Sequence, residues 1–138
     1  GIQKMKLRVG VVGVGRIAIQ SHLPSYRNLR NVELVALCDE RISAAKSAAS
    51  RFGINGFYDD LEKMLSKERL DIVGVCTPSP THASLSIEAM EAGCHVLVEK
   101  PMAMNVNEAD TMIASSKKHD VKLCVVHQNL YNPVVMRA

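Results

Sequence analysis

The sequence predicts an α/β fold, a doubly wound parallel sheet of six strands with helices on both faces, formed as a single domain by residues 1–138. Three observations predict it. Short runs rich in Val, Leu and Ile alternate along the chain with longer stretches of helical character. Several of these runs are apolar almost throughout, as expected of strands that helices cover on both faces. A glycine-rich turn follows the first run directly, within residues 10–18.

Six β-rich runs account for the sheet. Each is too short to form a long buried helix and is followed by turn-forming or helical sequence. In chain order the runs are Leu7–Val12, Glu33–Cys38, Phe57–Tyr58, Ile72–Cys76, Val96–Glu99 and Lys122–His127. Because crossovers between parallel strands are right-handed, we expect the spatial order 3-2-1-4-5-6.

Five helices are predicted between the strands. The first begins at Arg16 and is bent or ended near Pro24, because proline lacks the backbone N–H that an interior turn requires. The second stops at Gly53, which suits a C-cap. The last has acidic residues in its first turn and basic residues in its last, as the helix dipole favours. The helices after the first span Arg41–Phe52, Asp60–Lys67, Thr81–Ala92 and Asn107–His119.

Composition narrows the classes of function. Apolar residues make up 47% and charged residues 22%, and a net charge of +3 with 4% aromatic residues argues against nucleic-acid binding. No apolar run approaches the roughly 20 residues that span a bilayer, so no membrane association is expected. The cysteines form no C-x-x-C pair and have no His at metal-ligand spacing, which predicts reduced thiols, no metal site and a cytoplasmic location. They are Cys38, Cys76, Cys94 and Cys124.

The glycine-rich turn has the pattern G-x-G-x-x-A, between the first strand and the first helix. In this pattern Gly13 allows a tight turn, Gly15 lets the backbone approach a pyrophosphate, and Ala18 lets the helix pack against the strand. The N–H groups around Arg16 and Ile17 would face the anion, with the positive end of the helix behind them. The alternative is a glycine-rich turn that binds nothing. The position between strand and helix favours a Rossmann-type dinucleotide site.

An acidic residue ends the second strand. Asp39 lies 24 residues after Gly15, close to the spacing of about 20 found in dinucleotide-binding folds. A carboxylate there accepts hydrogen bonds from the ribose hydroxyls and repels a 2′-phosphate, which favours NAD. Its alternative role is to cap the next helix, and one residue can serve both purposes. The guanidinium of Arg41 can accept a 2′-phosphate, so NADP stays open.

The fourth strand is followed by a proline-rich loop. Thr77 and Pro78 open this loop, which cannot extend the strand and can form a wall over a dinucleotide. His82 follows in the first turn of the next helix. It either touches the cofactor or has a structural role.

The fifth strand ends in Glu99-Lys100-Pro101. In an open α/β sheet this position lies beside the expected nicotinamide. A lysine there can donate to a substrate hydroxyl, and its surroundings can adjust its pKa for proton transfer. The alternative is a solvated surface ion pair between Glu99 and Lys100. The place of the pair at the strand end, before Pro101, favours the catalytic interpretation.

Together these motifs resemble the amino-terminal half of the Gfo/Idh/MocA family of NAD(P)-dependent sugar and inositol oxidoreductases, from about Leu7 to Pro133. The resemblance implies that Lys100 is a catalytic lysine near the reacting hydroxyl, that Glu99 contacts the nicotinamide ribose, and that Gln128 approaches the nicotinamide. It makes Lys100-Pro101 a place to look for a cis peptide bond. It also implies dinucleotide contacts from Arg16, Ile17, Asp39, Thr77, Pro78 and His82.

The resemblance also implies what lies beyond this chain. Members of the family continue into a second α+β domain, which supplies most of the substrate pocket and the oligomer interface, whereas this chain stops at Ala138. We therefore expect the cofactor domain of a homo-oligomeric oxidoreductase acting on a sugar, cyclitol or related polyol, with little turnover by itself. Two alternatives stay open. One is a stand-alone NAD(P) sensor, and the other is an S-adenosylmethionine-binding domain, against which the Glu99–Pro101 motif and the sixth strand argue.

Overall fold

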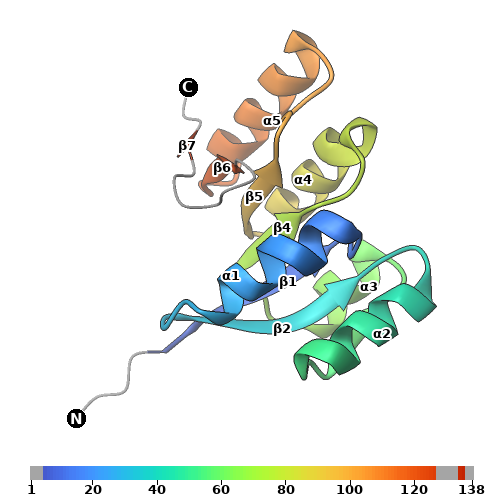
Figure 1. Cartoon of the computed structure of the whole chain (residues 1–138). Coiled ribbons are helices and arrows are strands. Elements are labelled where there is room, and N and C mark those ends of the chain that lie inside the picture. The colour runs from blue at the N-terminus through green and yellow to red at the C-terminus, as the bar shows by residue number, and fades with distance from the viewer. Residues whose placement is uncertain (1–4, 127–133, 136–138) are drawn as a thin grey trace.

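The central sheet runs in the order β3-β2-β1-β4-β5-β6-β7 (Figure 1). The computed structural model describes residues 5–126 and 134–135 of the chain. The first six strands are parallel and lie in the predicted order, and a short β7, which the sequence did not predict, pairs with β6 in the antiparallel direction. The strands are β1 (Leu7–Val12), β2 (Val32–Cys38), β3 (Gly56–Tyr58), β4 (Ile72–Val75), β5 (His95–Glu99), β6 (Leu123–Val126) and β7 (Val134–Val135).

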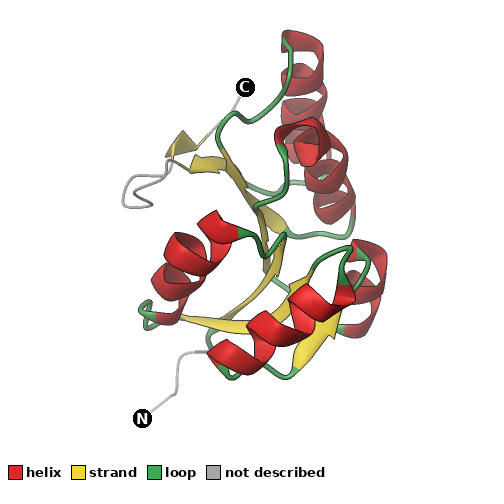
Figure 2. Ribbon diagram, turned by 45° about the vertical axis from the view of Figure 1, so that its right-hand side comes forward, coloured by secondary structure: helices red, strands yellow, loops and turns green. Residues whose placement is uncertain are grey.

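Helices cover both faces of the sheet (Figure 2). One buried apolar cluster joins α1 and α2 to one face, and a second joins α3, α4 and α5 to the other. The α-helices are α1 (Leu23–Arg27), α2 (Ile42–Phe52), α3 (Leu61–Lys67), α4 (His82–Glu91) and α5 (Val106–Lys118), with a π-helical segment η1 (Ala18–His22) and a 3₁₀ turn η2 (Ser79–Thr81). Strands and helices α2–α5 agree with the predicted ranges to within one residue at each end described.

The two clusters explain why the strands are apolar throughout. Val9 and Val11 of β1 belong to the cluster beneath α1 and α2, whereas Val12 belongs to the other. Val9 and Val11 are fully buried and Val12 is 4% exposed. Burying such a side chain contributes about 1.5–3 kcal/mol relative to leaving it in water, so both faces of the strand stabilise the fold.

The helix after the glycine turn does not end at Pro24. The N–H of Leu23 donates to the carbonyl of Ala18, five residues earlier, and Asn28 donates to Pro24, four residues earlier. The hydrogen-bond pattern therefore changes from π to α beside the proline. Pro24 occupies the second position of α1, where a missing N–H is tolerated. Segments of π-helix inside helices are frequent at functional sites.

Residues 5–126 contain no helix that is both long and apolar enough to span a bilayer.

Candidate functional site

The predicted site residues gather at one edge of the sheet, where the parallel strands end. Val12 of β1 lies beside Cys38 of β2 and Val75 of β4, and Val75 lies beside Val98 of β5. The turns that follow these strands therefore leave from the same edge. Strand order reverses between β1 and β4, and ligands of open α/β sheets bind at such a reversal.

The glycine turn packs directly against the end of β4. Gly13 has a φ of +95°, and a Cβ built on it would lie 2.7 Å from the carbonyl carbon of Cys76 and 2.8 Å from the nitrogen of Thr77. Its N–H donates to the carbonyl of Cys38 at 2.8 Å. Only glycine combines this backbone conformation with so close a contact. The tight turn predicted from the sequence is confirmed.

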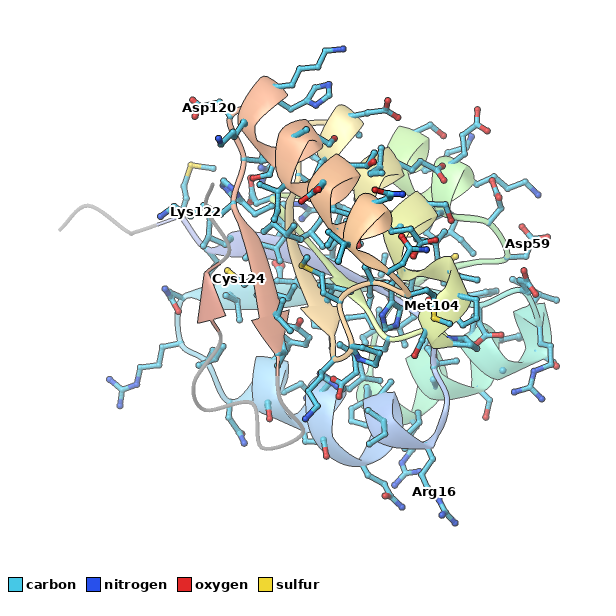
Figure 3. All side chains as sticks on the ribbon, turned by 90° about the horizontal axis from the view of Figure 1, so that it is seen from above. Arg16, Asp59, Met104, Asp120, Lys122 and Cys124 are labelled. Carbon is cyan, nitrogen blue, oxygen red and sulfur yellow. The ribbon has the colours of Figure 1, made fainter. Side chains whose placement is uncertain are left out.

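Gly15 has a different environment. A Cβ built on it meets no protein atom within 4 Å, so packing inside the chain does not require glycine there. Its carbonyl accepts from the N–H of Ile19 at 3.1 Å, which begins the helix. The first N–H groups of a helix have no partner within it and attract an anion. Arg16 is exposed, and its side chain extends away from the sheet (Figure 3). The open space at Gly15 and the first N–H groups of the helix fit a pyrophosphate.

Asp39 joins the glycine turn to the start of α2. One carboxylate oxygen accepts from the N–H of Val14 at 3.1 Å and the other from the N–H of Arg41 at 3.0 Å. The side chain is still 16% exposed. Because each carboxylate oxygen can accept two hydrogen bonds, capacity remains for ribose hydroxyls. The Arg41 side chain is 78% exposed, with its Nε 3.9 Å from the Asp39 carboxylate.

His82 connects the loops that follow β4 and β5. Its Nδ1 lies 2.7 Å from the carbonyl oxygen of Pro101, and its Nε2 lies 2.7 Å from the carbonyl oxygen of Thr77. The residue is 1% exposed. Both ring nitrogens thus face carbonyl oxygens of the protein, which favours the structural role, and a direct contact with the dinucleotide stays a prediction. Thr77 is half-buried and Pro78 is exposed beside it.

Glu99 pairs with a residue that the sequence did not single out. Its Oε2 lies 2.6 Å from Nε2 of His22, and the side chains are 13% and 2% exposed. The two atoms are in close polar contact, and neither has a hydrogen bond within the described part of the chain. Burial lowers the pKa of His22, and this effect outweighs the opposing one of Glu99. His22 follows the polar residues Gln20 and Ser21, so nothing in the sequence distinguished it or indicated a partner 77 residues away.

Lys100 is exposed at the end of β5. Its N–H donates to the carbonyl of Val126 at 3.2 Å, and the Lys100–Pro101 bond is cis, as the resemblance implied. Within the described ranges no ion pair involves Lys100, because the neighbouring carboxylate of Glu99 is paired with His22. The alternative of a surface Glu99–Lys100 ion pair is therefore wrong.

Thiol chemistry and metal binding receive no support. Burial raises the pKa of Cys38 to about 12 and that of Cys94 to about 11, and it also raises the pKa of Cys76. Such thiols are protonated at neutral pH and unreactive. Among the described residues, no group of three His, Cys, Asp or Glu side chains is placed to hold a metal ion. Gln128 lies outside the described residues.

Comparison with known families identifies this arrangement. The profile of the Gfo/Idh/MocA family, described as an oxidoreductase family with an NAD-binding Rossmann fold, matches residues 7–127. The chain belongs to this family. The match runs from the start of β1 past the end of β6, so it includes every turn described above. These residues are the NAD-binding Rossmann domain of a Gfo/Idh/MocA protein.

Individual members of the family are similar over most of this chain. D-glucoside 3-dehydrogenase of Escherichia coli (strain K12) is 39% identical over 112 residues, which are 81% of this chain and 32% of that protein. The crystal structure of the WlbA dehydrogenase from Bordetella pertussis, in complex with NADH and UDP-GlcNAcA, matches with a TM-score of 0.83 at 34% identity, over 88% of this chain and 37% of that one.

A third relative was crystallised with the phosphorylated cofactor. The 3-ketoreductase KijD10 from Actinomadura kijaniata, in complex with TDP-benzene and NADP, matches with a TM-score of 0.82 at 30% identity, over 87% of this chain and 38% of that one. The solved structures similar to this chain therefore include complexes with NADH and with NADP. The chain spans about a third of the length of the curated relatives it matches.

Proposed function

We propose that this chain is the cofactor domain of an oxidoreductase that transfers a hydride between nicotinamide and a hydroxyl-bearing carbon of a sugar, cyclitol or related polyol. One observation carries the proposal: the glycine turn after β1 and Lys100 after β5, which has no ion-pair partner among the described residues, lie on the same edge of the sheet. The relatives named as a glucoside dehydrogenase and as a dehydrogenase bound to a nucleotide sugar support this substrate class.

The residues that follow β1, β2 and β4 hold the dinucleotide. The tight turn at Gly13 and the open approach at Gly15 bring the backbone close to the pyrophosphate, and the N–H groups of Arg16 and Ile17 donate to it. Asp39 accepts from the adenosine ribose while it keeps its hydrogen bond to the glycine turn. Thr77 and Pro78 form the wall beside it. When bound, the cofactor supplies the hydride chemistry.

The turn that follows β5 acts on the substrate. Lys100 donates to the reacting hydroxyl and helps to move its proton, which a positioned side chain does efficiently only within hydrogen-bond reach. Glu99 and Gln128 are assigned to the nicotinamide end of the site. His82 contacts both the loop that begins with Thr77 and Pro78 (the wall loop) and the turn at Glu99–Pro101 (the lysine turn). It keeps these two parts of the site together.

The longer protein would add the rest of the active site. We assign the substrate pocket and a homo-oligomer interface to sequence outside residues 1–138, because the curated relatives are about three times as long as the matched segment. The thiols of Cys38, Cys76 and Cys94 form no disulfide, and those of Cys38 and Cys94 are buried, which favours a reducing, cytoplasmic location.

Calorimetric titration of the chain with NADH, NADPH and S-adenosylmethionine tests the binding half of the proposal. We expect saturable binding of NADH with one site and no binding of S-adenosylmethionine. In the protein that carries this domain, Lys100→Met should lower kcat about 10²–10⁴-fold with little change in the affinity for NADH. Binding of S-adenosylmethionine alone would overturn the proposal, and a Lys100→Met protein with unchanged kcat would remove the catalytic role.

A further inference from the structure

The turn that carries Lys100 is exposed, yet both of its neighbours in sequence are tied to buried side chains. Glu99 precedes the lysine and contacts His22, and Pro101 follows it and contacts His82. His22 is 2% exposed and His82 is 1% exposed. The two histidines come from different helical segments, η1 and α4, which start from the glycine turn and from the loop after β4.

The contact between Glu99 and His22 determines where the Glu99 carboxylate points. Nε2 of His22 and Oε2 of Glu99 lie 2.6 Å apart, and each is the only close polar partner of the other in the part of the chain described. Because burial lowers the pKa of His22, the ring is neutral at pH 7, and its Nε2 edge faces the carboxylate of Glu99. The pair holds Glu99 away from the ammonium group of Lys100, which is left without an ion-pair partner among residues 5–126.

The contact after the lysine fixes the other end of the turn. Carbonyl oxygens only accept hydrogen bonds, and those of Pro101 and Thr77 each lie 2.7 Å from a ring nitrogen of His82. A neutral ring has a single N–H and can donate to one of them, whereas a ring protonated on both nitrogens donates to both. In either form the ring spans the gap between the lysine turn and the wall loop.

We propose that His22 and His82 are positioning residues for Lys100, His22 acting through Glu99 and His82 through the carbonyl of Pro101. The functional part of this inference rests on the proposed role of Lys100. Each histidine links the lysine turn to a segment that holds the dinucleotide, the helix of the glycine turn on one side and the Thr77 loop on the other. The arrangement of Lys100 relative to the cofactor is thus set by two buried contacts.

Hydrogen exchange of the Lys100 amide, followed by NMR in the chain without ligand, tests the positioning directly. This N–H donates to Val126 at 3.2 Å, so its exchange reports opening of the turn. Asn at position 82 places an amide N–H near the position of Nδ1, and Gln places one near Nε2. His82→Gln, which loses the bond to Pro101, should speed exchange of Lys100 about ten-fold. His82→Asn, which keeps it, should have a smaller effect.

The same measurement applies to the other histidine. His22→Leu should speed exchange of the Lys100 amide about ten-fold, and His22→Gln, which retains a donor toward Glu99, should have a smaller effect. The N–H of Gly13, bonded to Cys38 at 2.8 Å, is the internal control, and its exchange should not change. Equal acceleration at Gly13 and Lys100 would indicate general destabilisation and overturn the proposal. So would unchanged exchange of Lys100 in all four variants.

A binding comparison separates this inference from the proposed function. Because the turn that carries Lys100 also carries Glu99, which is assigned to the nicotinamide end, we expect His82→Gln and His22→Leu to lower the affinity for NADH several-fold. The affinity for ADP-ribose, which lacks the nicotinamide, should be unchanged. If the unmodified chain bound neither ligand, the proposed function would fail, while the exchange data would still decide the positioning. Equal losses for both ligands would overturn a role confined to the lysine end.

Discussion

The two ends of the site are built in different ways. At the glycine turn most contacts are between backbone atoms, such as the N–H of Gly13 with the carbonyl of Cys38, and Gly13 packs on the backbone at the end of β4; the carboxylate of Asp39 adds one side-chain bond, to the N–H of Val14. At the lysine turn the contacts are made by side chains, from Glu99 to His22 and from His82 to the carbonyl of Pro101. Backbone packing is the main feature of the first end, and buried polar side chains are the main feature of the second.

This difference determines what a substitution does. A backbone-built turn accepts most side chains except where a Cβ has no room, so its sensitivity is concentrated at Gly13. A side-chain-built turn depends on pairs, and removal of one partner leaves a buried polar group without a hydrogen bond, which costs about 1–3 kcal/mol. The first end should therefore respond to a change of shape and the second to a change of chemistry or of pH.

The largest effect is expected at the first end. Gly13→Ala should lower the free energy of unfolding by about 3 kcal/mol, because its Cβ would collide with backbone 2.7 Å away in addition to the unfavourable φ of +95°. Gly53→Ala is the matched control, since φ is +68° there and no atom lies within 4 Å of the new Cβ. It should cost about 1 kcal/mol. Urea denaturation measures both, and equal losses would contradict a role for the backbone contact.

A smaller effect is expected from pH at the second end. The folded-state pKa of His22 lies below its ordinary value of 6.5, so below about pH 6.5 the unfolded chain binds more protons at this residue than the folded chain does. The stabilisation from neutral His22 is present above that pH and is lost as the pH falls, by at most about 1.4 kcal/mol per pH unit.

Urea denaturation at about pH 7.5 and about pH 5.5, for the unmodified chain and for His22→Gln, isolates this contribution. The unmodified chain should lose more stability than the variant between the two conditions, because glutamine does not titrate. The same pH response in both proteins would show that other groups account for it.

The smallest effect is expected at the exposed rim of the first end. Arg41 is 78% exposed, and its Nε lies 3.9 Å from the carboxylate of Asp39. Arg41→Ala should change the affinity for NADH less than about two-fold, since exposed ion pairs contribute little. Affinity for NADPH should fall further, because a guanidinium there can accept the 2′-phosphate. Fluorescence titration with both cofactors measures the difference, and equal changes would remove Arg41 from 2′-phosphate recognition.

The contrast between the two ends also explains which parts of the site were predictable. The glycine turn, the ranges of six strands and their order follow from local patterns, because glycines at fixed offsets and apolar runs express nearby backbone requirements. The place of Lys100 followed from its position at the end of a strand. The pairing of Glu99 did not follow, and the adjacent Lys100 was the more obvious partner in the sequence.

Residue types and spacing by themselves determined that the chain folds as a doubly wound sheet and that a dinucleotide turn and a lysine meet at one edge. Only the tertiary structure decided that His22 contacts the Glu99 carboxylate and that His82 lies between the carbonyl groups of Pro101 and Thr77. The physical reason is that backbone geometry leaves a local pattern in the sequence. A buried polar pair joins residues that become neighbours only when helices pack on the sheet, and its energy depends on that packing.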